Sequence, residues 1–192
     1  MVKANFLNRG TEDPKWQGPQ RHFFTVFAIK NLFLIVFAIL IVVESVLFRE
    51  WTRGYDSNNA AFWARNSIPI LVDSFLTLVT SWCIATQKWH PIAALVTSIF
   101  WPGVWVFGAT YNSVGPYSTE VYFPRDDQWW ALCWAEAAIQ CIIGILYYVM
   151  MGFAAKAVHE MRKAEIRRAV DVELSARRVS ERLSWDDAPG KV

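Results

Sequence analysis

The chain has 192 residues, enough for one domain, and 54% of them are hydrophobic while only 19% are charged. Soluble domains carry roughly 25% charged residues, so this composition excludes an ordinary soluble fold. A formal net charge of only +2 gives no indication of a nucleic-acid partner.

Four segments are long and apolar enough to cross a membrane as helices. A helix needs about 20 mostly apolar residues to span hydrocarbon, where the backbone must satisfy its own hydrogen bonds. The sequence therefore predicts an all-α fold: an integral membrane four-helix bundle over residues 22–157, between an N-terminal tail of residues 1–21 and a charged helix and tail of residues 158–192. The expected spans are residues 28–48, 68–86, 91–110 and 129–155.

The basic residues predict which side of the membrane each end occupies. Lys and Arg gather in the first tail and after the fourth span, and the short turn of residues 87–90 carries Lys88, whereas the two long loops offer only four arginines over about 37 residues. Because segments rich in Lys and Arg stay on the cytosolic side, both tails and the short turn are expected in the cytosol. Lys30, near the start of the first span, is expected to extend its ammonium to that interface. A plasma membrane or secretory-pathway membrane is the expected location.

After the fourth span, the sequence predicts a charged amphipathic helix. Ile166, Val170 and Leu174 recur at four-residue intervals among Glu and Arg residues. This pattern is typical of a solvated helix that extends the span. The same apolar stripe could instead contact a second copy of the chain or another protein, and both interpretations stay open.

Three acidic residues, Glu44, Asp73 and Glu136, lie inside the predicted spans. At 1.5 Å per helical residue, each is roughly 6–10 Å from the non-cytosolic end of its span. Ionisable groups in hydrocarbon are costly, and by default they are functional candidates that face the interior of a bundle. We therefore take these three residues as the catalytic candidates.

The carboxylates have two interpretations. In the structural one they pair with Arg49, Arg65 or Arg125 of the loops or stay protonated, and they fix the register of the helices. The isosteric changes Asp73→Asn and Glu136→Gln would then be tolerated. In the chemical one the carboxylates act as acid and base, or as ion ligands, in a pocket open to the non-cytosolic side.

The chemical interpretation also needs residues that hold an apolar substrate. The three histidines lie near the cytosolic ends, far from the acids, so no metal site is expected. No nucleophile elbow, phosphate loop or dinucleotide glycine motif occurs, and we expect no cofactor. The candidate substrate-binding residues near the acids are Trp101, Trp105, Trp134 and Gln140.

The layout resembles that of MARVEL-type tetraspan proteins, particularly the small fungal forms. It combines four spans, cytosolic tails, two longer outer loops, a short inner turn within WCIATQKWHP and a charged C-terminal helix. The resemblance covers roughly residues 21–157 and implies a scaffold for membrane apposition, lipid-domain organisation or vesicle traffic. We therefore expect a non-catalytic membrane-organising protein or accessory subunit, with the lipid bilayer as its partner. The alternatives are a small intramembrane enzyme of lyase or cyclase type, and a transporter or channel subunit.

Overall fold

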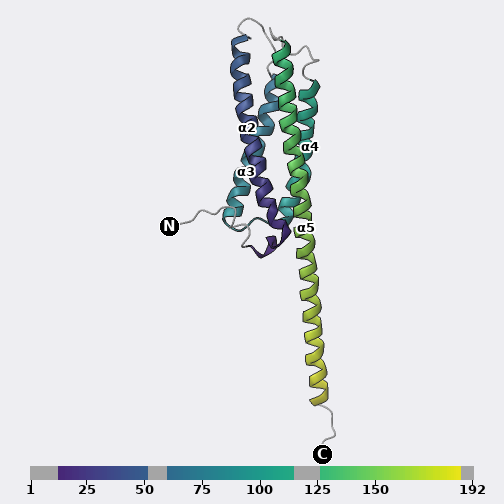
Figure 1. Cartoon of the computed structure of the whole chain (residues 1–192). Coiled ribbons are helices and arrows are strands. Elements are labelled where there is room, and N and C mark those ends of the chain that lie inside the picture. The colour runs from purple at the N-terminus through teal and green to yellow at the C-terminus, as the bar shows by residue number, and fades with distance from the viewer. Residues whose placement is uncertain (1–12, 52–59, 115–125, 187–192) are drawn as a thin grey trace, which may run out of the picture.

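The computed structural model describes residues 13–51, 60–114 and 126–186, and all regular structure within them is helical. The α-helices lie alongside one another, and one of them continues far beyond the ends of the others (Figure 1). In chain order the elements are the short 3-10 helices η1 (Pro14–Trp16) and η2 (Pro19–Arg21) and the α-helices α2 (His22–Trp51), α3 (Ala60–Ala85), α4 (Pro91–Val114) and α5 (Asp126–Asp186).

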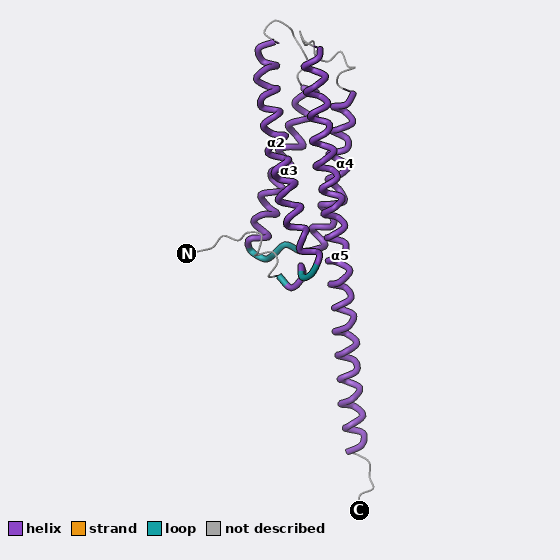
Figure 2. The backbone as a smooth tube through the Cα atoms, viewed as in Figure 1, coloured by secondary structure: helices purple, strands orange, loops and turns teal. Residues whose placement is uncertain are grey.

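Helix α5 joins two elements that the sequence predicts separately. The fourth span and the charged helix after it follow one another without a break over 61 residues, as Figure 2 shows. Residues 162–178 are exposed, including the apolar Ile166, Val170 and Leu174. The predicted helix in this segment is confirmed. It runs on without interruption at the expected boundary after residue 157, and burial ends a few residues later, beyond the buried Val158 and the half-buried Met161.

Several helix ends differ from the predicted spans because hydropathy measures the apolar stretch and helical hydrogen bonding extends beyond it. Helix α2 begins at His22, before the expected start at Ala28. Helix α3 begins at Ala60, well before Ile68, and runs through Pro69. Proline is tolerated in such helices where neighbouring groups satisfy the freed backbone. The polar Asn66 is therefore a helical residue of α3 that the apolar window leaves out.

The turn between α3 and α4 anchors the N-terminal segment. Lys88 donates its backbone N–H to the carbonyl of Cys83 at 2.8 Å, and Gln87 takes the left-handed conformation with φ of 56°. This six-to-one bond over a left-handed residue ends α3 in the manner of a Schellman motif. The indole of Trp16 then donates to the carbonyl of Trp89 at 3.2 Å. The last residues of the predicted N-terminal tail are thus part of the packed structure.

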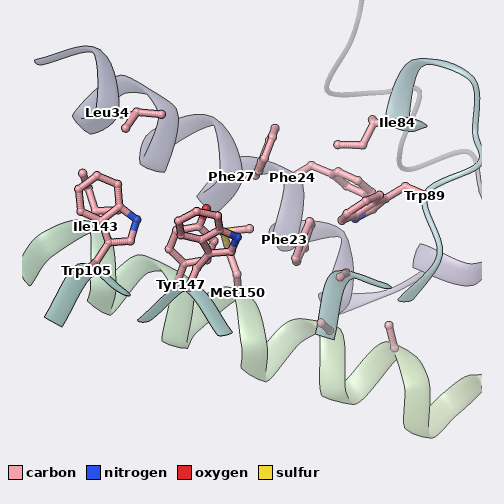
Figure 3. Close-up of a cluster of buried hydrophobic side chains, with 14 of the residues drawn as sticks. Phe23, Phe24, Phe27, Leu34, Ile84, Trp89, Trp105, Ile143, Tyr147 and Met150 are labelled. Atoms are coloured by element: carbon pink, nitrogen blue, oxygen red, sulfur yellow. The ribbon is translucent and has the colours of Figure 1, made fainter. Parts of the chain in front are cut away.

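A cluster of buried aromatic and aliphatic side chains fills the end of the structure near this turn (Figure 3). Trp16 packs against Phe23 and Phe24, with ring centroids 4.9 and 5.1 Å away. Aromatic pairs at such distances contribute beyond the area that they bury. The cluster joins η1, α2 and α5 with the turn between α3 and α4, and it continues along the helices to Phe37 and Trp105, whose ring centroids are 5.7 Å apart.

Along their apolar stretches, the four α-helices expose large apolar side chains and bury several polar ones, unlike the helices of a soluble protein. Leu71, Phe75 and Leu78 on α3 are between 67% and 69% exposed. Single exposed apolar residues are ordinary, but here such residues occur along all four α-helices. All four helices are long and apolar enough to cross a membrane. The polar side chains with no exposed surface are Lys30, Glu44, Asn66, Asp73, Ser98, Asn112, Glu136 and Gln140.

Candidate functional site

Asp73 lies at the centre of a buried hydrogen-bond network that joins all four helices. Its Oδ1 accepts from the Lys30 ammonium at 2.9 Å and from the Tyr147 hydroxyl at 2.7 Å. Its Oδ2 accepts from the indole of Trp105 at 3.0 Å. The Lys30 ammonium also donates to Thr77 Oγ1 at 2.9 Å, and the Thr77 hydroxyl is 3.0 Å from its acceptor, Asn31 Oδ1. We call these six residues the Asp73 layer.

The expectation that Lys30 reaches the membrane interface is wrong. Its side chain has no exposed surface, and its ammonium forms an ion pair with Asp73 inside the structure. The ammonium also lies 5.4 Å from the ring centroid of Phe27 and 5.2 Å from that of Tyr147. An opposite charge acts far more strongly in a low-dielectric interior than in water, so a carboxylate on the neighbouring helix turns the lysine inward.

A second polar cluster lies further along the same helices, and we call it the Glu136 layer. Asn66 Nδ2 donates to Glu136 Oε2 at 3.3 Å. Asn112 Nδ2 donates to Asn66 Oδ1 and to Gln140 Oε1, both at 3.0 Å. Among the described residues, Asn112 Oδ1 and Gln140 Nε2 are buried without a hydrogen-bond partner. Buried polar atoms are costly to leave unpaired, so this layer has hydrogen-bonding capacity that its own side chains do not use.

The two layers are related by the seven-residue repeat of the buried positions. Asn66 precedes Asp73, Trp105 precedes Asn112, and Gln140 precedes Tyr147, each by two helical turns. At 1.5 Å per residue, this spacing separates the layers by roughly 10 Å. On α2, the buried residues Lys30, Phe37 and Glu44 follow the same interval. Buried residues at alternating three- and four-residue steps are typical of helices packed in the manner of a coiled coil.

Sequence reasoning identified the acids and one partner of Asp73, Trp105, but it missed other partners. Asn66, Asn112 and Tyr147 were not among the candidates, although the buried positions of α5 follow steps of four and three residues from Trp129 through Cys133, Glu136 and beyond. The repeat reaches Tyr147 on α5 itself, and the same seven-residue interval after Trp105 on α4 places Asn112 in the interior. The signal was therefore present in the spacing of polar and aromatic residues, and a reading of hydropathy alone does not detect it.

The structure does not bring the three acids into one group. Asp73 and Glu136 belong to different layers, and Glu44 is buried on α2. Within the described ranges, no three His, Cys, Asp or Glu side chains are placed to hold a metal ion. The expected loop partners cannot be compared, because the side chains of Arg49 and Arg65 and the whole of Arg125 lie outside the described residues.

The aromatic candidates separate into two groups. Trp105 belongs to the Asp73 layer, and Trp101 is buried and stacks on Tyr147 with ring centroids 6.4 Å apart. Trp134 instead is half exposed, and it lines an apolar groove of about 410 Å³ between α4 and α5. Gln140, the polar candidate, lies inside and accepts the bond from Asn112. Of the four predicted substrate-binding residues, only Trp105 and Gln140 belong to the two polar layers.

The described residues form an all-helical structure with two polar layers buried inside it and large apolar side chains exposed along its four α-helices. No protein-family model, curated protein or solved structure matches the chain.

Proposed function

We propose that the chain is an integral membrane protein that crosses the bilayer four times and serves as a non-catalytic organising scaffold or accessory subunit. The observation that carries membrane insertion is the distribution of side chains along the apolar stretches of the four helices. Large apolar side chains are exposed there, whereas the carboxylates of Glu44, Asp73 and Glu136 and the amides of Asn66, Asn112 and Gln140 have no exposed surface. Lipid can cover such a surface, whereas water cannot do so without a large free-energy cost.

The hydrogen bonds of Asp73 support a structural role for this carboxylate. It accepts bonds from Lys30 on α2, Trp105 on α4 and Tyr147 on α5. Polar side chains between membrane helices commonly fix which faces pack together. A carboxylate occupied by donors from every other helix is suited to hold register, and it has little free capacity for a substrate or an ion.

The distribution of basic residues supports cytosolic placement of both tails and of the turn between α3 and α4. The exposed part of α5 would then project into the cytosol, where its charged surface is solvated. This layout, with its resemblance to MARVEL-type proteins, supports membrane organisation or traffic in the plasma membrane or secretory pathway. Ile166, Val170 and Leu174 would be available there to a protein partner or a second copy.

A second candidate function, an intramembrane enzyme, is favoured by the Glu136 layer. Here a buried carboxylate lies beside amides of which two atoms, Asn112 Oδ1 and Gln140 Nε2, have no partner among the described residues. Such atoms could orient a polar group of a substrate while Glu136 exchanges a proton. This candidate places any chemistry in the Glu136 layer and leaves the Asp73 layer structural.

The two candidates are tested by isosteric changes in the native host. Cells that lack the protein would be complemented with Glu136→Gln, and with the Lys30→Met, Asp73→Asn double variant, after alkaline extraction has shown each to be membrane-integrated. The scaffold proposal expects both folded variants to restore the deletion phenotype. Loss of complementation by folded Glu136→Gln alone would favour the enzyme, because an amide cannot exchange a proton at neutral pH. Extraction of the parent protein by alkali would contradict membrane insertion itself.

A further inference from the structure

A groove of about 800 Å³ opens at the end of the structure where the N-terminal segment meets α5. Its lining includes Lys15 and Gln20 from the N-terminal segment, His90 from the turn before α4, and Lys156 and Arg168 from α5. Pockets that bind small ligands commonly have volumes of roughly 300–1,000 Å³. The groove therefore has room for a small polar molecule, and segments far apart in the sequence form it.

The groove is rich in charges that are not paired with one another. Lys15, Lys156 and Arg168 line it together with the carboxylates Glu160 and Glu165. Among the described residues, Lys30 and Asp73 form the one salt bridge. None of these five groove side chains is therefore in a salt bridge with another described residue. Basic side chains in a groove are suited to bind a phosphate. The carboxylates beside them are suited to bind a hydrogen-bond donor or an ammonium.

Two further side chains add directional hydrogen bonding. Gln20 is only 6% exposed, lines the groove, and has its Oε1 unpaired among the described residues. That buried acceptor requires a donor. His90 Nδ1 accepts the backbone N–H of Ile92 at 3.3 Å, which places the proton of the neutral ring on Nε2, where it can be donated. The groove thus offers an acceptor and a donor in addition to its charges.

The position of the groove indicates where its ligand comes from. Lys156 directly follows the apolar stretch of the fourth span, and His90 directly precedes α4, a span candidate that begins at Pro91. If the chain crosses a membrane as proposed above, these residues lie at the level of the lipid headgroups. Basic pockets at that level bind anionic lipid headgroups.

We propose that this groove binds the headgroup of an anionic phospholipid that carries an ammonium or hydroxyl group as well as its phosphate. The lysines contact the phosphate, and Arg168, roughly 18 Å from Lys156 along α5, contacts the end of the headgroup furthest from the membrane. Gln20 Oε1 accepts a hydrogen bond from the headgroup, and the two glutamates favour its ammonium or hydroxyl end. Phosphatidylserine and phosphatidylinositol have this chemistry, whereas phosphatidic acid has the phosphate without such a group. The inference rests on the proposed membrane insertion.

The test uses the full chain in phosphatidylcholine nanodiscs that contain a minor fraction of phosphatidylserine, phosphatidylinositol or phosphatidic acid. The chain is released from the nanodiscs, and native mass spectrometry counts the lipids that remain bound to it. We expect retention of phosphatidylserine and phosphatidylinositol above phosphatidic acid. Lys156→Gln and Arg168→Gln should each lower retention roughly fivefold, the usual effect of one cation at a membrane surface. Gln20→Met should remove the preference over phosphatidic acid and leave the retention of phosphatidic acid unchanged.

Arg167→Gln is the matched control, because Arg167 is exposed beside Arg168 and does not line the groove. An equal loss in this variant would overturn the inference, since it would indicate diffuse attraction of charge. Equal binding of soluble glycerophosphoserine in detergent would also overturn it, because the ligand would then be a free phosphate ester. A chain that enters nanodiscs and shows no headgroup preference overturns only this inference, whereas a chain that does not enter them contradicts the proposed function.

Discussion

Lys30 on α2 and Asp73 on α3 form an ion pair with Nζ and Oδ1 2.9 Å apart, and neither side chain has exposed surface. Taking both charges out of water costs free energy, and their attraction and added hydrogen bonds offset that cost. A buried pair of this kind therefore contributes less to net stability than to specificity. Removal of one partner is strongly destabilising, because it leaves an uncompensated charge in the interior.

Asp73→Asn and Lys30→Met are each expected to lower the free energy of unfolding by about 3–5 kcal/mol, because each leaves the other charge buried and unpaired. The double variant removes both charges and should be clearly more stable than the sum of the two losses predicts. Reversible unfolding by SDS in mixed micelles would measure all four corners of this cycle. Additive losses would contradict a direct interaction between the two side chains.

The Tyr147 hydroxyl is expected to contribute one hydrogen bond to the Asp73 layer. It donates to Asp73 Oδ1 at 2.7 Å, while its ring is buried in the hydrophobic core. Tyr147→Phe retains the ring and should lower stability by about 1–2 kcal/mol. Hydrogen bonds to charged groups contribute about 1.5–3 kcal/mol, and those measured between membrane helices about 0.6–2 kcal/mol.

Tyr148→Phe is the control for that change, because the neighbouring Tyr148 is 52% exposed. A substitution of this kind on the surface should alter stability by less than about 0.5 kcal/mol. The same SDS titration compares the two variants in one experiment. Equal effects at the two positions would show that the Asp73 bond contributes nothing measurable.

The sequence was sufficient to predict the helices, and the reason is physical. The segments that became α2, α3, α4 and α5 are long and apolar, and such segments have few alternatives to helix. The fold class followed from that constraint. Helix ends such as Ala60 were less predictable, because Arg65, Asn66 and Ser67 interrupt the apolar stretch just before Ile68 while the helix continues through them.

The partners of the acids were harder to predict, because pairing depends on how helices rotate against one another. Asp73 was a candidate on sequence alone, yet Lys30, 43 residues earlier, was assigned to the interface. With that lysine as its partner, Asp73→Asn is no longer the tolerated change that the isolated sequence suggests. A lysine in a span can either extend to the interface or pair inside it, and only the packed structure decides between these outcomes.

Membrane topology gives the third prediction. Single cysteines at Ser57, Ser118 and Ser180 would be introduced after the native cysteines, which include the exposed Cys141, are removed. Ser57 and Ser118 lie outside the described residues, between α2 and α3 and between α4 and α5 in the sequence, and Ser180 lies in α5. The distribution of Lys and Arg predicts that an impermeant thiol reagent applied to intact cells labels the first two positions. Labelling at Ser180 alone would reverse the orientation.

The last prediction concerns Gly108, where α4 approaches α5 in the Glu136 layer. A Cβ added to Gly108 would lie 3.0 Å from Gln140 Nε2 and 3.3 Å from Gln140 Cδ. Gln140 cannot move away freely, because its Oε1 accepts the 3.0 Å bond from Asn112. Gly108→Ala should therefore lower stability by about 1–3 kcal/mol through overpacking, despite the better helix propensity of alanine.

Gly103→Ala provides the comparison within the same helix, because a Cβ at Gly103 meets no atom within 4 Å. Without a clash, only helix propensity remains, and this variant should be neutral or more stable by up to about 1 kcal/mol. The cost at Gly108 should also shrink in a Gln140→Ala background, where the colliding amide is absent. If Gly108→Ala is as stable as Gly103→Ala, the close approach of α4 to Gln140 is not a feature of the folded protein. If its cost persists without Gln140, the strain arises elsewhere in the contact between α4 and α5.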